Sequence, residues 1–459
     1  MAGRKITRPR ILLYDARMPN SATSAAPKIS ANQSLAGAFL GCLSYLYWWV
    51  TITPFADLSG APSLLASEAG SNLLNQFIAL AMFAAMLVIG LQPNKRSLLS
   101  SFSGVLLLMF VWLAVASLVG HVEAVSFRRL TMAFVVCVCA NVFLLLPRSQ
   151  AQFAGMLVFS SFVILALSFF GVAFLPSRSI HLDTDVLEPL LAGDWRGLFS
   201  HKNAAAPAMV VTIFIGLYYA GVQSRLVGLL LAAAAVVFLY KTGGKTALGL
   251  LPVTLIVAWL VEKLGAMLRW TIIVATVGGY GLVTLGSAAF KPIKHLVASL
   301  GIDESFTGRT EIWTVALDAI RAKPIFGYGY ENFWGSEQVV YGIREEGTWA
   351  VTAPTAHNAY LDLAVAGGLV GLAIALIWLV VIPTRHISSA VAADARPGLT
   401  RLFIRVWIFC LLLGHLESFY FGAGGGLWFF MMVAVFGLGM QARVGRLAIG
   451  QRTALRRAS

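Results

Sequence analysis

The stretch AHNAYLDLAVAGGLVGLAIA, Ala356–Ala375, opens the apolar run that decides the fold class. It begins with the polar pair His357 and Asn358 and then continues mainly as small and aliphatic residues. A helix of about twenty such residues is long enough to cross the hydrocarbon core of a bilayer. We therefore predict a transmembrane helix over roughly 357–383, with polar residues at its N-terminal end.

Apolar runs of this kind recur along the 459 residues of the chain. Hydrophobic residues make up 58% of the composition and charged residues 12%, which is about half the charged share of a soluble domain. The pattern predicts an all-α polytopic membrane protein with about twelve transmembrane helices. Its predicted parts are, roughly, a basic tail (1–34), a first bundle (35–287) with an extracytoplasmic segment (177–202), a long extracytoplasmic loop (288–356), three last helices (357–442) and a second basic tail (443–459).

The positive charge follows the predicted topology. The net charge is +14, and most of the 34 lysine and arginine residues fall on one side if the N-terminus is cytoplasmic. Cytoplasmic segments carry such an excess in membrane proteins, so we predict that both termini are cytoplasmic. The charge also favours anionic lipid. A nucleic-acid partner is excluded, because the charges are spread along membrane edges and form no single patch.

Three polar segments interrupt the apolar pattern, and all three fall on the predicted outer side. The first ends in GDWRGLFSHKN, before a predicted helix. The second is YKTGGKT, between two predicted helices, and the third is the long loop. Cations at the outer face run against the usual charge bias, so their recurrence in three loops predicts a shared function.

The long loop contains a predicted amphipathic helix. Its apolar residues Ile312, Trp313, Ala316, Leu317 and Ile320 recur at helical spacing. A proline and two glycines follow in PIFGYG, so we expect the helix to end before this turn. The apolar face is expected to rest on the membrane interface or on neighbouring helices.

Arg309 is predicted to lie at the N-terminus of this helix, after Thr307 and Gly308. A cation there opposes the helix dipole. The position makes sense if the arginine and the first backbone N–H groups face an anion such as phosphate. The alternative is an ordinary solvated loop arginine.

Bland interpretations remain open for other polar residues. Lys241 and Lys245 can be lysines that extend to the membrane interface. His415 and Glu417, in GHLESFY, can be a buried pair or part of a cavity. No supporting pattern surrounds four further histidines, which are His121, His181, His295 and His386. The four cysteines lie in apolar runs and are expected to be buried without disulfides.

The segment TGRTEIWTVALDAIRAKPIFGYGYENFW, followed by AHNAYLDLAVAGGLVGLAIA, resembles the O-antigen ligase and Wzy-type polymerase superfamily. Its pattern is Gly-Arg near a Trp, then a Pro-x-x-Gly-x-Gly turn, then His-Asn before a glycine-bearing span. WRGLFSHKNAAAPAMV resembles an earlier family element, in which Arg-Gly leads into His-x-Asn. The sequence LFSHKN resembles the corresponding segment of rhizobial exopolysaccharide polymerases more than that of lipid A-core ligases.

The resemblance implies a GT-C-like membrane glycosyltransferase of the bacterial inner membrane. Such an enzyme takes a glycan from an undecaprenyl pyrophosphate carrier and joins it to an acceptor hydroxyl at the periplasmic face. It needs no cofactor, and no outer loop here carries a carboxylate motif for a divalent cation. A chain-length regulator and a flippase are possible partners.

The resemblance and the chemistry together suggest roles for individual residues. His357 is expected to be the catalytic base, and Arg309 is expected to act with Arg196 on the departing pyrophosphate. Asn358 is expected to orient sugar hydroxyls or the loop. Further expected substrate contacts are His201, Lys202, Asn203, Lys241 and Lys245. The rival bases are Asp194, Asp303 and Glu304.

Three functions remain open from the sequence. The first is a polymerase that extends repeat units, and the second is a ligase that moves a finished glycan to lipid A-core or a protein. The third is a transporter for a lipid-linked sugar. Transporters carry polar residues within their spans and repeated halves, whereas here the ionisable residues gather at one predicted face.

Overall fold

In the computed structural model, the regular secondary structure of the described residues is helical, apart from one short backbone pairing between Ile180 and Trp195. The described residues are 31–58, 73–91, 102–122, 124–185, 189–299, 301, 306, 308–336, 339, 353–393, 396–422 and 424–458. Asp303, Glu304, nearly all of the predicted N-terminal tail and most of residues 337–352 lie outside them. The predicted all-α class is confirmed.

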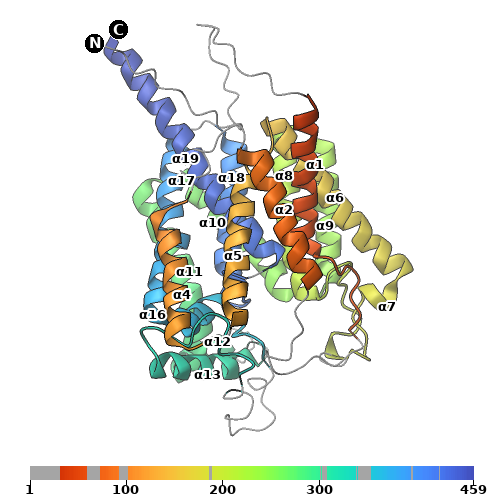
Figure 1. The fold of residues 1–459 in the computed structure, drawn as a ribbon, viewed down its shortest axis with the longest axis vertical. Helices are drawn as coiled ribbons and strands as arrows, with labels where there is room; N and C mark the ends of the chain where they lie inside the picture. The colour runs from red at the N-terminus through yellow and green to blue at the C-terminus, as the bar shows by residue number, and fades with distance from the viewer. Residues whose placement is uncertain are drawn as a thin grey trace.

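Long helices form a bundle in which they run roughly alongside one another (Figure 1). They are α1 (Ala31–Val50), α2 (Leu73–Leu91), α4 (Gly104–Val119), α5 (Ala124–Phe143), α6 (Gln150–Phe174), α8 (Lys202–Val222), α9 (Arg225–Lys241), α10 (Lys245–Lys263), α11 (Ala266–Ala289), α16 (Ala359–Leu376), α17 (Ile382–Ala393), α18 (Pro397–Leu413) and α19 (Gly426–Ala458). A π-helical turn, η2 (Ile377–Val381), joins α16 to α17. The short helices are α7 (Pro176–Ser179), η1 (Pro189–Leu191), α12 (Lys291–Ser299) and α13 (Arg309–Ala322).

Seven of the described helical segments are long and apolar enough to cross a membrane, and three shorter apolar helices accompany them. Every predicted span overlaps one of the bundle helices. The protein is therefore a polytopic membrane protein, and the count of about twelve spans stays a prediction. In Figure 1, α1 begins and α19 ends at the same end of the bundle, while α13 lies across the opposite end.

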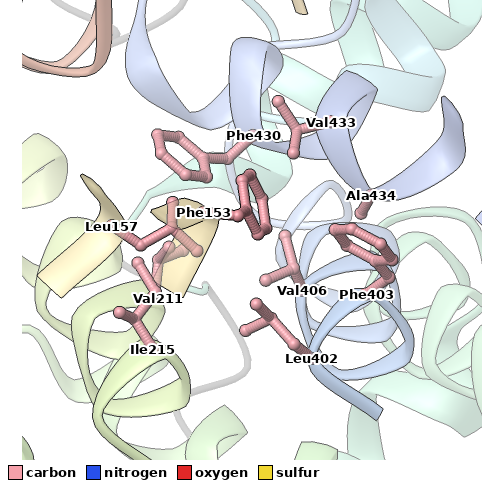
Figure 2. A pocket seen from close by; sticks show the side chains of 10 residues that line it. All are labelled: Phe153, Leu157, Val211, Ile215, Leu402, Phe403, Val406, Phe430, Val433 and Ala434. Atoms are coloured by element: carbon pink, nitrogen blue, oxygen red, sulfur yellow. The ribbon is translucent and has the colours of Figure 1, made fainter. Parts of the chain in front are cut away.

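Helices α18 and α19 lie at the centre of the bundle. All side chains from Leu402 to Leu413 except that of Arg405 are buried, as are all those from Trp428 to Ala442. Between α6, α8, α18 and α19 is a cavity of about 10 Å³, lined by apolar side chains (Figure 2). A space of that size holds about one water molecule, so this part of the core is a packed interior with no room for a substrate.

Helix α16 is broken at Gly368, whose φ of 68° and ψ of −174° are not helical. The break takes the carbonyl groups of Val365 and Ala366 out of the regular helical ladder. The N–H of Tyr328 donates to the Val365 carbonyl at 2.8 Å, and that of Gly329 donates to the Ala366 carbonyl at 3.0 Å. Backbone groups in a membrane helix must find partners inside the protein, and the PIFGYG turn supplies them here.

The same turn supports the other side of the break. The N–H of Leu369 donates to the carbonyl of Pro324 at 2.8 Å. Trp112, from α4, donates its indole N–H to the Gly367 carbonyl at 2.7 Å and stacks on Phe326 with ring centroids 5.2 Å apart. The PIFGYG turn is therefore held between α16 and α4.

Two glycines make this close approach possible. Gly327 has a φ of 69°, and a Cβ atom there would collide with the carbonyl oxygen of Val365. A Cβ atom on Gly368 would collide with the carbonyl of Ile325. Glycine is required at both positions because each combines a left-handed φ with direct backbone contact.

Helix α13 confirms the predicted amphipathic helix. It begins at Arg309, after Gly308 in the left-handed conformation, and it ends at Ala322, before the PIFGYG turn. Trp313 is fully buried and donates its indole N–H to the carbonyl of Ala356 at 3.0 Å. Of the two predicted environments for the apolar face, neighbouring protein is therefore the one observed for this tryptophan.

Some predicted boundaries differ from the structure. Within the predicted region of the last three helices (357–442), α18 ends at Leu413, so His415 and Glu417 lie in a turn. At this end of α18, the carbonyl of Gly414 accepts the N–H of Ala359 at 2.7 Å. In a continuing helix, the same carbonyl would accept an N–H from four residues further along the chain. Helix α19 continues to Ala458, past the predicted start of the C-terminal tail.

We expect the Gly368→Ala substitution to destabilise the fold for two reasons. The alanine Cβ atom would clash with Ile325 of the PIFGYG turn, and alanine would have to adopt the positive φ of residue 368. Such strain costs about 1–3 kcal/mol. The measurement is the thermal unfolding midpoint of purified protein in detergent. The control is Gly278→Ala in α11, where a Cβ atom meets nothing within 4 Å. Equal midpoints for the two variants would contradict the role of the break.

Candidate active site

Three ionisable side chains from separate segments meet at the end of the bundle that α13 covers. Arg309 is the first residue of α13, His357 precedes α16, and Glu417 follows α18. Nη2 of Arg309 donates to Oε1 of Glu417 at 2.8 Å, and Nδ1 of His357 lies 3.9 Å from Oε2 of Glu417. We call Arg309, His357 and Glu417 the Arg309 cluster. Each side chain is between 16% and 24% exposed, so the cluster remains accessible to a ligand.

His357 has an unusual backbone conformation, with a φ of 46°. Few residues other than glycine adopt such angles, and they concentrate at functional sites. Nδ1 of the ring is buried and forms no hydrogen bond within the part of the chain that the structure describes. Its 3.9 Å separation from the Glu417 carboxylate is too long for a hydrogen bond. The imidazole is therefore held beside a carboxylate without being engaged by it.

Asn358 fixes the position of His357. Its Oδ1 accepts the N–H groups of Tyr360 and Leu361 at the start of α16, and its Nδ2 donates to the carbonyl of His415 at 3.0 Å. Its backbone N–H donates to Oγ of Ser418 at 2.9 Å. Asn358 is fully buried. Of its two predicted roles, the structure supports orientation of the loop.

Asp362 is a second residue that holds this turn, and sequence reasoning missed it. Its Oδ1 accepts the N–H of Ala356 at 2.9 Å and the indole N–H of Trp334 at 2.7 Å. The available signal was an acidic residue four positions after Asn358 in an otherwise apolar span. Ionisable residues in such spans are rare and mark functional or structural sites.

Sequence reasoning noted Glu417 only together with His415. Burial raises the pKa of Glu417, but the nearby imidazole of His357 and the guanidinium of Arg309 lower it by more, so the pKa lies below its ordinary value of 4.5. The carboxylate is therefore ionised at neutral pH. It forms the negative centre of the Arg309 cluster.

His415 does not pair with Glu417. Its ring stacks on Tyr360 with centroids 4.4 Å apart and meets Tyr280 of α11 edge-on at 5.5 Å. Neither ring nitrogen has a hydrogen-bond partner among the described residues. His415 therefore acts as a packing residue between α11 and α16.

A second polar cluster surrounds the N-terminus of α8. Nζ of Lys202 contacts Oδ2 of Asp194 at 2.6 Å, and Nδ1 of His201 accepts the N–H of Asn203 at 3.0 Å. His181 accepts the backbone N–H of Lys202 at 3.3 Å through Nε2. We call these five residues, together with Arg196, the α8 cluster.

Arg196 is 1% exposed, and its guanidinium group donates hydrogen bonds to backbone carbonyl groups. Its Nη2 donates to the carbonyl of Ala56 at 2.9 Å, and its Nη1 donates to that of Phe199 at 3.3 Å. The arginine therefore joins the segment after α1 to the segment before α8. Through these hydrogen bonds, Arg196 holds the backbone of the segment that leads into the α8 cluster.

Lys241 and Lys245 flank the turn between α9 and α10, and both are exposed. Nζ of Lys241 lies 5.8 Å from the ring centroid of Trp195, next to Arg196 in the chain. Gly243 contacts Asp194 so closely that a Cβ atom would collide with the carboxylate. The two lysines thus border the α8 cluster.

His181 is a member of this cluster that sequence reasoning set aside. It is 2% exposed, and its Nδ1 lies 2.9 Å from Oδ2 of Asp185. Burial lowers the pKa of His181 against the opposing hydrogen bond with Asp185. A neutral ring agrees with its acceptance of the Lys202 N–H.

The described side-chain hydrogen bonds of the two predicted arginines go to different partners. Arg309 contacts Glu417, whereas the described partners of Arg196 are Ala56 and Phe199. In Figure 1, α7, which leads into the α8 cluster, and α13 both lie toward the lower end of the bundle, α7 at the right and α13 at the left. The joint contact of the two arginines with one pyrophosphate stays a prediction.

The fold and the site together define a polytopic helical membrane protein with cationic, histidine and carboxylate groups gathered at one end. Residues 208–376 match the family described as O-Antigen ligase. This segment contains Arg309 and His357 and ends at the last residue of α16. The match covers less than half of the chain and supports the resemblance of this segment to the O-antigen ligase and Wzy-type family.

One curated relative supports the same family. The chain is 28% identical over 147 residues to the exopolysaccharide production protein ExoQ of Rhizobium meliloti. The alignment covers 28% of this chain and 33% of the relative, so the chain matches about a third of that protein's length. Together the two matches support a membrane enzyme of the polysaccharide polymerase or ligase type.

Glu417 should make the stability of the protein depend on acid pH. Because its pKa is lower in the folded state, its stabilising contribution is complete above 4.5 and is lost as the pH falls through the folded value. A charge-assisted hydrogen bond of this kind is worth about 1–3 kcal/mol. We expect Glu417→Gln to unfold at a lower temperature than wild type at neutral pH and to lose less stability below pH 4.5.

Thermal unfolding in detergent across this pH range provides the measurement. Asp318→Asn is the control, because the Asp318–Arg321 pair is more than 60% exposed on both sides and should contribute little. Parallel pH curves for wild type and Glu417→Gln would contradict the assignment.

Proposed function

We propose that this protein is a membrane glycosyltransferase that polymerises oligosaccharide repeat units carried on a polyprenyl pyrophosphate. The observation that carries the proposal is the meeting of Arg309 and His357 at one end of the bundle, within the family-matched segment. A cation suited to phosphate and a group suited to proton transfer are the two functions that this reaction requires.

Arg309 serves the leaving group in this proposal. As the bond between the anomeric carbon and the phosphate oxygen breaks, negative charge grows on the pyrophosphate. A guanidinium group can donate paired hydrogen bonds to phosphate oxygens, and the first N–H groups of α13 lie beside it. Both would stabilise the departing charge without a metal ion.

His357 serves the acceptor. The attacking sugar hydroxyl must lose a proton, and imidazole is the usual general base near neutral pH. If the base and the leaving-group cation act on opposite sides of the sugar, the reaction inverts the anomeric centre. Asp194 is a weaker rival, because it is paired with Lys202 in the α8 cluster.

The α8 cluster is proposed to contact the glycan or phosphate of a bound substrate. Lys241 and Lys245 are exposed cations that border the cluster, and the imidazole of His201 is only partly buried. Arg196 is buried beneath them, so its proposed contribution is to position the segment. A polymerase handles two lipid-linked glycans, and polar groups beyond the Arg309 cluster suit that need.

The acceptor distinguishes polymerase from ligase. The name of the rhizobial relative, an exopolysaccharide production protein, favours polymerisation. The family description, O-Antigen ligase, keeps transfer to lipid A-core or a protein as the second candidate. A flippase and a chain-length regulator are proposed as partners of the polymerase. Loss of polymer in a deletion strain, with unpolymerised repeat units left on the carrier, would identify the polymerase.

We propose that the Arg309 cluster faces the periplasm and that both termini are cytoplasmic. A cysteine introduced at Ser336, near the cluster end, should react with a membrane-impermeant maleimide in spheroplasts. A cysteine introduced at Gln223, exposed at the turn between α8 and α9, should react only after permeabilisation. The reverse labelling pattern would overturn both the orientation and the mechanism.

Replacement of His357 by alanine should abolish turnover because the general base is lost. We expect at least about a 100-fold fall in kcat with purified protein and its lipid-linked repeat unit. His295→Ala is the matched control, since His295 lies exposed on α12. Turnover near wild type in His357→Ala, at normal membrane levels, would show that another group is the base.

A further inference from the structure

The Glu417 carboxylate lies between the two residues that carry the proposed reaction. Its Oε1 accepts a hydrogen bond from Arg309 at 2.8 Å, and its Oε2 lies 3.9 Å from Nδ1 of His357. The side chain is 18% exposed. One carboxylate therefore faces both the proposed phosphate-binding cation and the proposed base, and among the described side chains it is hydrogen-bonded to the cation alone.

Glu417 and His357 are fixed to each other by the backbone. The N–H of Ala359 donates to the Gly414 carbonyl at 2.7 Å, and Nδ2 of Asn358 donates to the carbonyl of His415 at 3.0 Å. The backbone N–H of Asn358 donates to Oγ of Ser418 at 2.9 Å. The segments that carry Glu417 and His357 therefore form one unit, whereas Arg309 reaches this unit through its side chain.

The Arg309–Glu417 pair competes with a phosphate ligand. A guanidinium group bonded to a carboxylate has fewer N–H donors for another anion, and two anions at one cation repel each other. The described charged groups near Arg309 and His357 are Glu417 and Asp362, and Asp362 is already engaged by Ala356 and Trp334. Glu417 is thus the described carboxylate that competes with a phosphate ligand for Arg309.

We infer that Glu417 is a positioning residue. When the donor binds, its carboxylate gives up the hydrogen bond from Arg309 and accepts one from His357. This inference rests on the proposed function. Arg309 turns to the pyrophosphate, and the released carboxylate accepts the Nδ1–H of His357. That hydrogen bond fixes the tautomer, so that Nε2 carries the free electron pair toward the acceptor hydroxyl.

The chemical step then balances with the groups present. The acceptor hydroxyl gives its proton to Nε2 of His357 as its oxygen bonds to the anomeric carbon. The bond from that carbon to the phosphate oxygen breaks, and its electron pair leaves with the pyrophosphate, which Arg309 holds. The imidazolium stays beside the Glu417 carboxylate until the proton passes to water or to the departing phosphate.

The exchange predicts an unusual kinetic signature for Glu417→Gln. The variant keeps the shape of the side chain but removes the charge that competes for Arg309 and stabilises the imidazolium. We expect kcat to fall by about 10- to 100-fold. The KM for the lipid-linked donor should stay unchanged or fall. Arg309→Lys, assayed in parallel, should instead raise this KM.

Glu311→Gln is the matched control, because Glu311 is exposed in the first turn of α13. It should leave both constants at wild-type values. Glu417→Asp provides a second variant if Glu417→Gln folds poorly, since it keeps the charge but withdraws the carboxylate from His357. We expect it to lower kcat without raising the donor KM.

Two results would overturn the inference. One is a kcat close to wild type in Glu417→Gln and Glu417→Asp, and the other is a rise in donor KM that accounts for the whole loss. His357→Ala separates this failure from failure of the proposed function. If His357→Ala is inactive while the Glu417 variants behave as wild type, only the exchange is wrong. If His357→Ala is active, the proposed base is wrong as well.

Discussion

The hydrogen bonds between the PIFGYG turn and the broken helix α16 are the constraint on which the end of the bundle depends. A helix interrupted inside an apolar bundle exposes carbonyl groups that neither lipid nor apolar side chains can satisfy. Tyr328 and Gly329 donate to these carbonyls, and Leu369 donates back to Pro324. The loop is thereby fixed against a span, although its sequence is polar and glycine-rich.

This docking also determines where α13 lies. The C-terminal end of α13 leads directly into the turn held by α16, and Trp313 binds the carbonyl of Ala356 at the other end of the same span. The helix is therefore attached to α16 at two places. Arg309, at its first residue, is brought to Glu417 and His357 as a result.

The charge balance of the Arg309 cluster differs from that of a simple cationic phosphate site. A carboxylate occupies the described hydrogen bond of Arg309, and a second carboxylate, Asp362, holds the turn before His357. In the absence of the lipid-linked donor substrate, Glu417 neutralises the charge of Arg309, which limits the free-energy cost of a partly buried charge. The α8 cluster follows the same rule, since Lys202 is paired with Asp194.

Much of the fold followed from the sequence because hydropathy acts locally. The positions of the bundle helices, the ends of α13 and the place of Arg309 at its start could all be predicted from apolar spacing, Pro324 and the glycines. The motif around His357 likewise carried the resemblance to the O-antigen ligase and Wzy-type superfamily. These features depend on neighbours within about one or two helical turns.

Only the tertiary structure decided which polar groups meet. Glu417 lies far along the chain from Arg309, and nothing in its local pattern distinguishes a partner of His415 from a partner of Arg309. The different partners of Arg196 and Arg309 were equally hard to predict, because both residues stand beside a glycine before a helix. Packing of α13 and the turn after α18 against α16 determines these distances, and such packing depends on side chains from every part of the chain.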